Sequence, residues 1–158
     1  MKKLSHVDNA GQARMVDVGA KLISQRFARA TGSIRMKPDT LKAIQQNALV
    51  KGDVLGVARI AGIMAAKRTS DLIPLCHPIS LTDVEVTLKL DDSLPGVTCE
   101  ATTRTSDRTG VEMEAITAVA VSLTTIYDMV KSVDRGVTID GICLLEKDGG
   151  RSGHWVRR

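Results

Sequence analysis

One uncharged helical segment constrains this chain more than any other feature. Between positions 111 and 134 apolar residues recur at steps of three and four, which is the spacing of one face of an α-helix. The stripe consists of Ile116, Val119, Leu123, Ile126, Val130 and Val133. Gly136 follows and is expected to stop the helix. The sequence therefore predicts a long amphipathic helix with a wide apolar face.

The outer side of this predicted helix is unusual because the stretch AITAVAVSLTTIY, residues 115–127, contains no charged side chain. A helix that packs on a sheet normally exposes charge to water on its other side. The outer positions Thr117, Val121 and Thr124 carry none. We expect another surface to cover them.

A second predicted helix repeats the signal over residues 53–68, DVLGVARIAGIMAAKR. Arg59 is its only charge between Asp53 and Lys67, and Gly56 and Gly62 would allow close approach of another backbone. The two helices together predict a homo-oligomer.

Alternating segments predict the strands. Residues 21–36 alternate partially, residues 83–91 alternate cleanly, and residues from Val97 alternate again after the turn DSLPG. A short helix starts at Pro38, and residues 137–147 supply a closing strand. The order predicts an α+β, ferredoxin-like βαββαβ domain with an antiparallel sheet and helices on one face. We expect a single domain over 1–158, with 1–20 and 148–158 flexible.

Charge, apolar content and cysteine spacing limit the classes of protein to which this chain can belong. Lys and Arg number 22 against 18 for Asp and Glu, which gives a net charge of +4 and a mild preference for anionic partners. The N-terminus is basic but lacks the apolar stretch of an export signal, and no run is long enough to span a membrane. Three cysteines without C-x-x-C spacing suit reduced thiols. We expect a cytoplasmic protein.

Asp128 and Lys131 are spaced i, i+3 on the long helix, opposite its apolar stripe. They could form an ordinary surface ion pair, which contributes little to stability. On an otherwise uncharged face that a partner covers, an acid and a lysine are costly unless they are paired or used. The pair is therefore also a candidate functional site.

Glu112 and Glu114 lie in the first turn of the same helix, where carboxylates commonly do no more than complement the helix dipole. At ~1.5 Å per residue, Glu114 and Asp128 would lie about 21 Å apart along the helix axis. If both contact one small ligand, the site must join one end of this helix to the opposite end of a neighbour's.

The loop DLIPLCHP, residues 71–78, places Cys76 beside His77 between two prolines. Two ligands are too few for a typical zinc site, so no metal site is predicted. Adjacent side chains on an extended segment point to opposite faces, which makes the pair a poor nucleophile–base dyad. A rigid loop that presents His77 to a ligand and simple stiffening by proline remain the two readings.

Basic residues elsewhere carry weaker signals. Lys51 precedes the second helix and Lys67 ends it, and both could be solvated side chains. The segment KDGGRSG, residues 147–153, could fold amides and cations around phosphates, although it lacks the order of a P-loop.

Three motifs in combination resemble the cyclic pyranopterin monophosphate synthases of molybdenum-cofactor biosynthesis, the MoaC family. They are KGDVLGVARIAGIMAAKRTSDLIPLCHP, TGVEMEA and IYDMVKSVD, and the similarity extends from MVDV at Met15 to GGRSG. The resemblance implies a ferredoxin-like domain, a hexamer built as a trimer of dimers, and sites at the dimer interface. It also implies a lyase that converts 3′,8-cyclo-7,8-dihydroguanosine 5′-triphosphate to cyclic pyranopterin monophosphate and pyrophosphate.

The resemblance also implies roles for particular residues. Asp128 looks like the general acid/base, with Lys131 beside it and Lys51 reaching from the facing subunit. The implied substrate-binding residues are Leu75, Cys76, His77, Glu112, Met113 and Glu114, with Cys76 acting through its backbone. The candidates for the triphosphate are Lys21, Arg26, Lys67 and Lys147. Arg151 stands where a lysine is expected, which keeps the charge and changes its geometry.

No tightly bound cofactor is implied, and Mg²⁺ could accompany the triphosphate. Two other function classes remain open. An RNA-binding module of this fold would stack bases on aromatic side chains of the sheet, yet Phe27, Tyr127 and Trp155 are the only aromatic residues. We therefore expect no nucleic-acid partner. A non-catalytic nucleotide-sensing domain would bind the nucleotide without releasing pyrophosphate.

Overall fold

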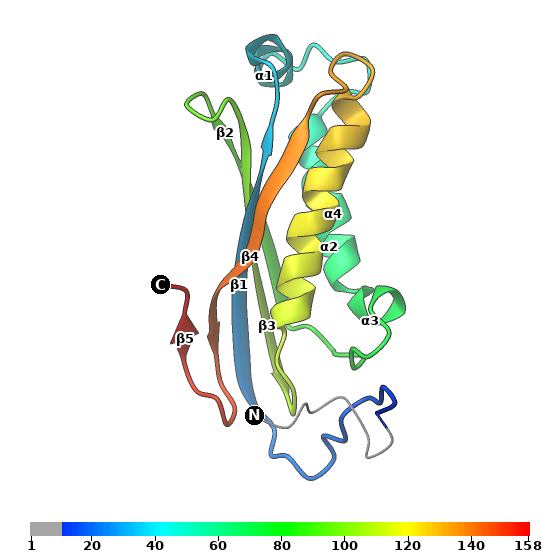
Figure 1. Cartoon of the computed structure of the whole chain (residues 1–158), viewed down its shortest axis with the longest axis vertical. Helices are drawn as coiled ribbons and strands as arrows, with labels where there is room; N and C mark the ends of the chain where they lie inside the picture. The colour runs from blue at the N-terminus through cyan, green and yellow to red at the C-terminus, as the bar shows by residue number, and fades with distance from the viewer. Residues whose placement is uncertain (1–10) are drawn as a thin grey trace.

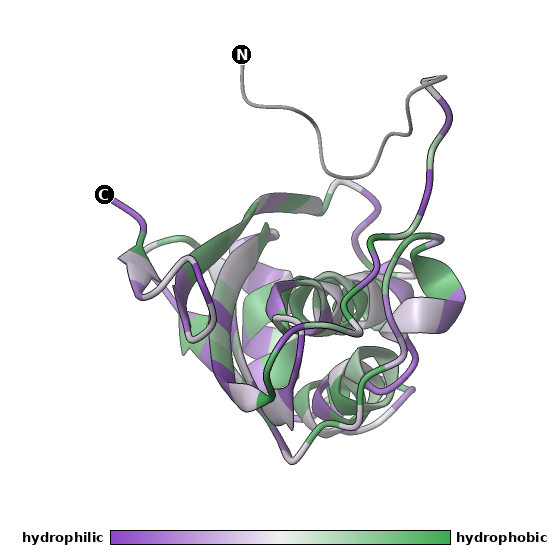
Figure 2. Cartoon of the chain, turned by 90° about the horizontal axis from the view of Figure 1, so that it is seen from below, coloured by the Kyte–Doolittle hydropathy of each residue, from purple (hydrophilic) through white to green (hydrophobic). Residues whose placement is uncertain are grey.

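The computed structural model describes residues 11–158 as one sheet covered on one side by helices (Figure 1). The strands are β1 (Ser24–Arg35), β2 (Asp83–Asp91), β3 (Gly96–Asp107), β4 (Thr138–Asp148) and β5 (Trp155–Val156). The helices are α1 (Pro38–Gln45), α2 (Val54–Ala66), α3 (Thr69–Leu72) and α4 (Glu112–Val130). Seen along the helix axes, α2 and α4 lie together against the same face of the sheet (Figure 2). The predicted α+β class is confirmed.

The strand order in the sheet is β2-β3-β1-β4-β5, and all neighbouring strands are antiparallel. The first four strands have the order of the ferredoxin-like βαββαβ arrangement that the sequence predicts. The short β5 was not predicted, because two residues that pair with β4 carry no recognisable alternation. The flexibility of residues 148–158 stays a prediction, and residues 1–10 of the other proposed flexible segment lie outside the described residues.

The alternation in β1 has the expected cause. Ala28, Ala30 and Ile34 are fully buried under the helices, and Gly32 lies on the same face. A side chain at Gly32 would press against Leu123 of α4, so the glycine lets this helix lie close to the sheet. Small residues on β1 therefore fix the distance between the two layers.

The uncharged face of α4 is covered largely by α2 of the same chain. Thr117 is 7% exposed, and Gly62 of α2 lies against Ser122 and the Ala118 carbonyl of α4. The expectation that a partner must cover this face is corrected, because an intramolecular helix covers much of it. Only Thr124 remains exposed among the three outer positions.

The prediction of an apolar stripe on α4 is mostly correct. Val119, Leu123, Ile126 and Val130 are fully buried. Val133 is 57% exposed, so its prediction as a core residue is wrong. The physical reason is that α4 ends at Val130, before the predicted stop, and Val133 lies in the turn that follows.

The turn after α4 is tied to α1 through Asp134, which is 2% exposed. Its carboxylate accepts hydrogen bonds from the backbone N–H of Lys37 at 2.9 Å, the hydroxyl of Thr40 at 3.3 Å and the N–H of Gly136 at 3.1 Å. These bonds lower the pKa of Asp134, the one from Lys37 most. Asp134 thus caps a helix whose own N-cap residue makes no side-chain hydrogen bond.

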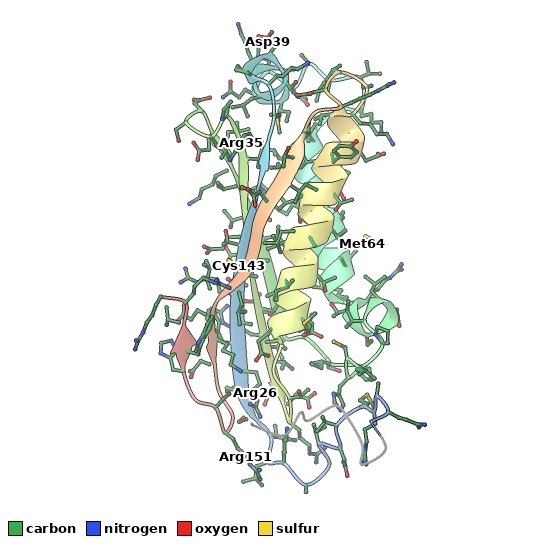
Figure 3. The ribbon with its side chains drawn as sticks, viewed as in Figure 1. Arg26, Arg35, Asp39, Met64, Cys143 and Arg151 are labelled. Atoms are coloured by element: carbon green, nitrogen blue, oxygen red, sulfur yellow. The ribbon has the colours of Figure 1, made fainter. Side chains whose placement is uncertain are left out.

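Apolar surface remains on the outer side of α2, where Val57, Ile60 and Met64 are between 45% and 60% exposed (Figure 3 labels Met64). Helix α4 is long and apolar enough to cross a membrane, but more than half of it is buried in the fold, as expected of a core helix. The outer side of α2 is therefore one surface that would favour a partner.

Gly62→Ala is expected to destabilise the fold by about 1–3 kcal/mol, because a new Cβ would overlap Ser122 Oγ where α2 crosses α4. Urea unfolding measures the loss. The double variant Gly62→Ala/Ser122→Ala removes the overlapped atom and should recover part of it. A double variant no more stable than Gly62→Ala would contradict this account of the crossing.

Candidate functional site

A carboxylate with two lysines lies where the C-terminal end of α4 meets the loop before α2. The Nζ of Lys51 donates to Asp128 Oδ2 and to the Asp128 carbonyl, each at 2.8 Å. The Nζ of Lys131 lies 2.6 Å from Asp128 Oδ1. Each carboxylate oxygen thus has its own lysine, and the three groups form what we call the Asp128 cluster.

The two lysines hold the Asp128 carboxyl in its ionised form. The hydrogen bond from Lys131, followed by the one from Lys51, lowers the pKa of Asp128 to about 2. The same pairing raises the pKa of Lys131. At neutral pH this cluster can therefore accept a proton or position an ammonium group, and Asp128 itself holds no proton to donate.

The position of Lys51 corrects one expectation. Lys51 was predicted to reach Asp128 from a facing subunit, whereas one chain supplies all three groups. The physical reason is local: α1 and the turn after it bring Lys51 back beside α4, and Asp134 ties α1 to that end of α4. The predicted partnership of Lys51, Asp128 and Lys131 is otherwise as expected.

A cavity of about 690 Å³ lies at the opposite end of α4. We call it the ring pocket. Its lining includes all six predicted substrate-binding residues, namely Leu75, Cys76, His77, Glu112, Met113 and Glu114. Val16, Val18, Ile73 and Ile79 add apolar surface. Apolar walls with a few polar groups are typical of small-molecule sites. This lining would suit a ligand with a flat, partly polar ring.

Glu114 is a buried acid of this pocket. It is 3% exposed, and burial raises its pKa to about 7. Burial also raises the pKa of the nearby Cys76 thiol, with a smaller contribution from the charge of Glu114. Burial thus favours the thiol form of Cys76, and the role of this residue in the site stays a prediction.

The Cys-His loop is fixed at both of its central residues. The N–H of Cys76 donates to the Ile73 carbonyl at 3.0 Å, and Nε2 of His77 lies 2.7 Å from the Val16 carbonyl. The contact with the Val16 carbonyl requires a proton on Nε2 of His77, so in the neutral imidazole Nδ1 would be the acceptor. The loop is therefore rigid through hydrogen bonds as well as through its prolines.

A second cavity, of about 630 Å³, adjoins the ring pocket and shares Lys21, Thr109, Gly110 and Glu112 with it. We call it the basic pocket. Five cations line it: Lys21, Arg26, Arg108, Lys147 and Arg151. Lys147 pairs with Glu112 at 2.7 Å, and within residues 11–158 the other four form no ion pair. Unpaired cations around a cavity favour a highly charged anion.

Three of the residues predicted to bind phosphate lie together in the basic pocket, namely Lys21, Arg26 and Lys147. Lys67 lies at the end of α2 and lines neither pocket. Arg108 was missed, because a lone arginine after a strand has no distinguishing pattern, and its Nε donates to the Lys21 carbonyl at 3.1 Å. Ser24 was also missed; its hydroxyl is buried without a partner among the described residues, and it lines the basic pocket.

The site therefore consists of two parts at opposite ends of the molecule. The ring and basic pockets lie at the N-terminal end of α4, and the Asp128 cluster lies beside its C-terminal end (Figure 1). Arg26 and Arg151 mark the pocket end in Figure 3. Within residues 11–158, no group of three His, Cys, Asp or Glu side chains could hold a metal ion.

Fold and site define a class: a ferredoxin-like domain with a joined ring and anion pocket at one end of a helix and a lysine-paired carboxylate at the other. The chain belongs to the MoaC family, whose model matches residues 15–150. Two relatives from Brucella ovis and Brucella melitensis biotype 2, both named cyclic pyranopterin monophosphate synthase, are 57% identical over 154 residues. The alignment covers 98% of this chain and 93% of each relative.

Replacing Glu114 by Gln should remove a pH dependence of stability. A protonated Glu114 contributes stability that is full below about pH 4.5 and is lost as pH rises through about 7, because the folded state holds the proton more tightly. The loss amounts to at most about 3 kcal/mol. Urea unfolding between pH 4.5 and 8 should show this decline in the wild type and not in Glu114→Gln. The exposed Glu85→Gln is the control, and an equal slope in all three proteins would contradict the burial argument.

Proposed function

We propose that this chain is a cyclic pyranopterin monophosphate synthase, a phosphorus–oxygen lyase of molybdenum-cofactor biosynthesis. It would convert 3′,8-cyclo-7,8-dihydroguanosine 5′-triphosphate to cyclic pyranopterin monophosphate and pyrophosphate. The observation that carries the proposal is the pairing of a five-cation pocket with a pocket that contains a buried acid, in a member of the MoaC family. The proposed substrate also has two parts, a ring system and a triphosphate, which correspond to these two pockets.

The two pockets suit the two parts of the substrate. In the ring pocket, Glu114 can donate a hydrogen bond to a ring atom when protonated, and Met113 and Leu75 can pack against the ring faces. In the basic pocket, Lys21, Arg26, Arg108 and Arg151 would neutralise the phosphates and the departing pyrophosphate.

The Asp128 cluster supplies the proton chemistry. Rearranging the rings requires positioned acids and bases, and closing the cyclic phosphate requires removal of a proton from the attacking hydroxyl. Asp128 can accept that proton, while the two ammonium groups can donate protons or stabilise negative charge.

A complete site would need two chains. The pockets and the Asp128 cluster are separated by the length of α4, about 21 Å between Glu114 and Asp128 at ~1.5 Å per residue. A two-fold related partner with an antiparallel α4 would bring its Asp128 cluster to these pockets. The proposed assembly is a hexamer formed as a trimer of dimers, with the exposed apolar residues of α2 among its buried contacts.

Three further expectations accompany the function. The protein would work in the cytoplasm, where its thiols stay reduced. No tightly bound cofactor takes part, and Mg²⁺ could accompany the triphosphate. A non-catalytic nucleotide sensor is the alternative, and it would bind the same nucleotide without turnover.

Purified protein should release pyrophosphate from the cyclised dihydroguanosine triphosphate. Asp128→Ala should lower the rate by about a hundredfold or more, the usual range for loss of a general acid or base. Lys89→Ala, which removes an exposed lysine on β2, is the matched control. Tight binding without pyrophosphate release by the wild type would identify a sensor and refute the proposed activity.

Subunit mixing tests the two-chain site. Asp128→Ala and Lys147→Ala, each expected to be inactive, affect opposite halves of the site, so exchange of subunits should restore about a quarter of the wild-type sites. Lys51→Ala mixed with Asp128→Ala is the control. Both residues belong to one cluster, so every mixed site stays defective.

Recovery in the first mixture and none in the second is the expected pattern. If subunit exchange is demonstrated and neither mixture recovers activity, each site lies within one chain. Recovery in the Lys51/Asp128 mixture would show that these two residues serve different sites.

A further inference from the structure

Arg26 projects from β1 into the wall of the basic pocket without an acidic partner. Its Nε donates to the Asp107 carbonyl at 3.3 Å, and its Nη2 donates to the Arg108 carbonyl at 3.2 Å. Within residues 11–158 the guanidinium forms no ion pair. These two bonds fix the plane of the group and leave the N–H donors of Nη1 for another acceptor.

The space beside Nη1 is the place where residue 150 would carry its side chain. Gly150 has φ +72°, and a Cβ built there would overlap Nη1 of Arg26 and lie 2.6 Å from its Cζ. The guanidinium therefore occupies the volume of the missing side chain. Figure 3 shows Arg26 at the same end of the molecule as the neighbouring Arg151.

The preceding glycine has a different neighbour. A Cβ at Gly149 would overlap the backbone carbonyl of Gln25 in β1, which cannot move without disturbing the sheet. At Gly150 the obstacle is the far end of a flexible side chain, which can swing away. An alanine at position 150 should therefore displace Arg26 and leave the sheet intact.

We propose that Gly150 is a positioning residue, whose missing side chain keeps the Arg26 guanidinium against the carbonyls of Asp107 and Arg108, with Nη1 directed at a phosphate group of the ligand. The inference rests on the proposed function in one respect, since the phosphate belongs to the substrate's triphosphate. Arginine binds phosphate through fixed, directional N–H groups, so a displaced guanidinium loses much of its contribution.

The test is calorimetric titration of the full-length protein with inorganic triphosphate. Gly150→Ala should weaken binding on the order of tenfold to a hundredfold, the value of a hydrogen bond to a charged group. Gly153→Ala is the matched control: Gly153 also has a positive φ, +61°, but a Cβ there meets no atom within 4 Å. The control therefore carries the backbone strain alone, and its affinity should stay within about twofold of the wild type.

A double variant tests whether Gly150 affects triphosphate binding through Arg26. Arg26→Ala should weaken triphosphate binding, and Gly150→Ala/Arg26→Ala should bind no more weakly than Arg26→Ala, because the residue that Gly150 positions is gone. Thermal unfolding should give similar losses for Gly150→Ala and Gly153→Ala.

Four results would overturn the inference: equal affinities of Gly150→Ala and Gly153→Ala, fully additive losses in the double variant, a Gly150→Ala protein that fails to fold while Gly153→Ala folds, or a wild type that does not bind triphosphate. Failure of the proposed function is distinguishable. In that case the wild type would bind triphosphate, Gly150→Ala would lose that binding as expected, and no pyrophosphate would be released from the nucleotide.

Discussion

The packing of α4 against the sheet and α2 determines where chemistry can occur in this protein. Val119, Leu123 and Ile126 are fully buried along the helix, so α4 behaves as a rigid rod. Glu114 lies near one end of the rod and Asp128 near the other. A single chain cannot bring these acids to the same small ligand. This fixed separation is the reason why we propose a site that is shared between two chains.

The two ends of α4 also place their acids in opposite environments. Asp128 is exposed and lies between two lysines, which lower its pKa to about 2. Glu114 is buried at the edge of the ring pocket, and burial raises its pKa to about 7. At neutral pH one carboxyl group is ionised and the other holds a proton much of the time. In the proposed two-chain site, such a difference would let one position accept a proton and another donate a proton or hydrogen bond.

Patterns of short range in the sequence were sufficient for most of the fold. The alternation in β1 and the three-and-four spacing in α4 arise directly from the faces that these elements bury. Much of the ring pocket was also predictable, because six of its lining residues lie in two contiguous motifs, whereas Val16 and Val18 come from a third segment that was not predicted. Periodicity alone does not assign roles to residues. The resemblance to the MoaC family supplied those expected roles.

Features that depend on distant segments were not predictable. The uncharged face of α4 suggested a partner chain, but its cover is α2, and only the three-dimensional packing distinguishes the two. Lys51 was assigned to a facing subunit on the family resemblance, and the sequence does not show that the turn after α1 brings Lys51 back to Asp128 of the same chain. Arg108 was missed because its importance comes from its place beside the Lys21 carbonyl. These errors share one cause: the sequence does not show which segments meet in space.

The measurement that most directly tests the central claim is an experimental structure of the oligomer with pyrophosphate or a nucleoside triphosphate analogue bound. We expect the phosphates to be held by Lys21, Arg26 and Lys147 of one subunit, with the Asp128 cluster of its neighbour facing the same ligand. A ligand that contacts residues of one chain only, with every Asp128 cluster remote from it, would contradict the account.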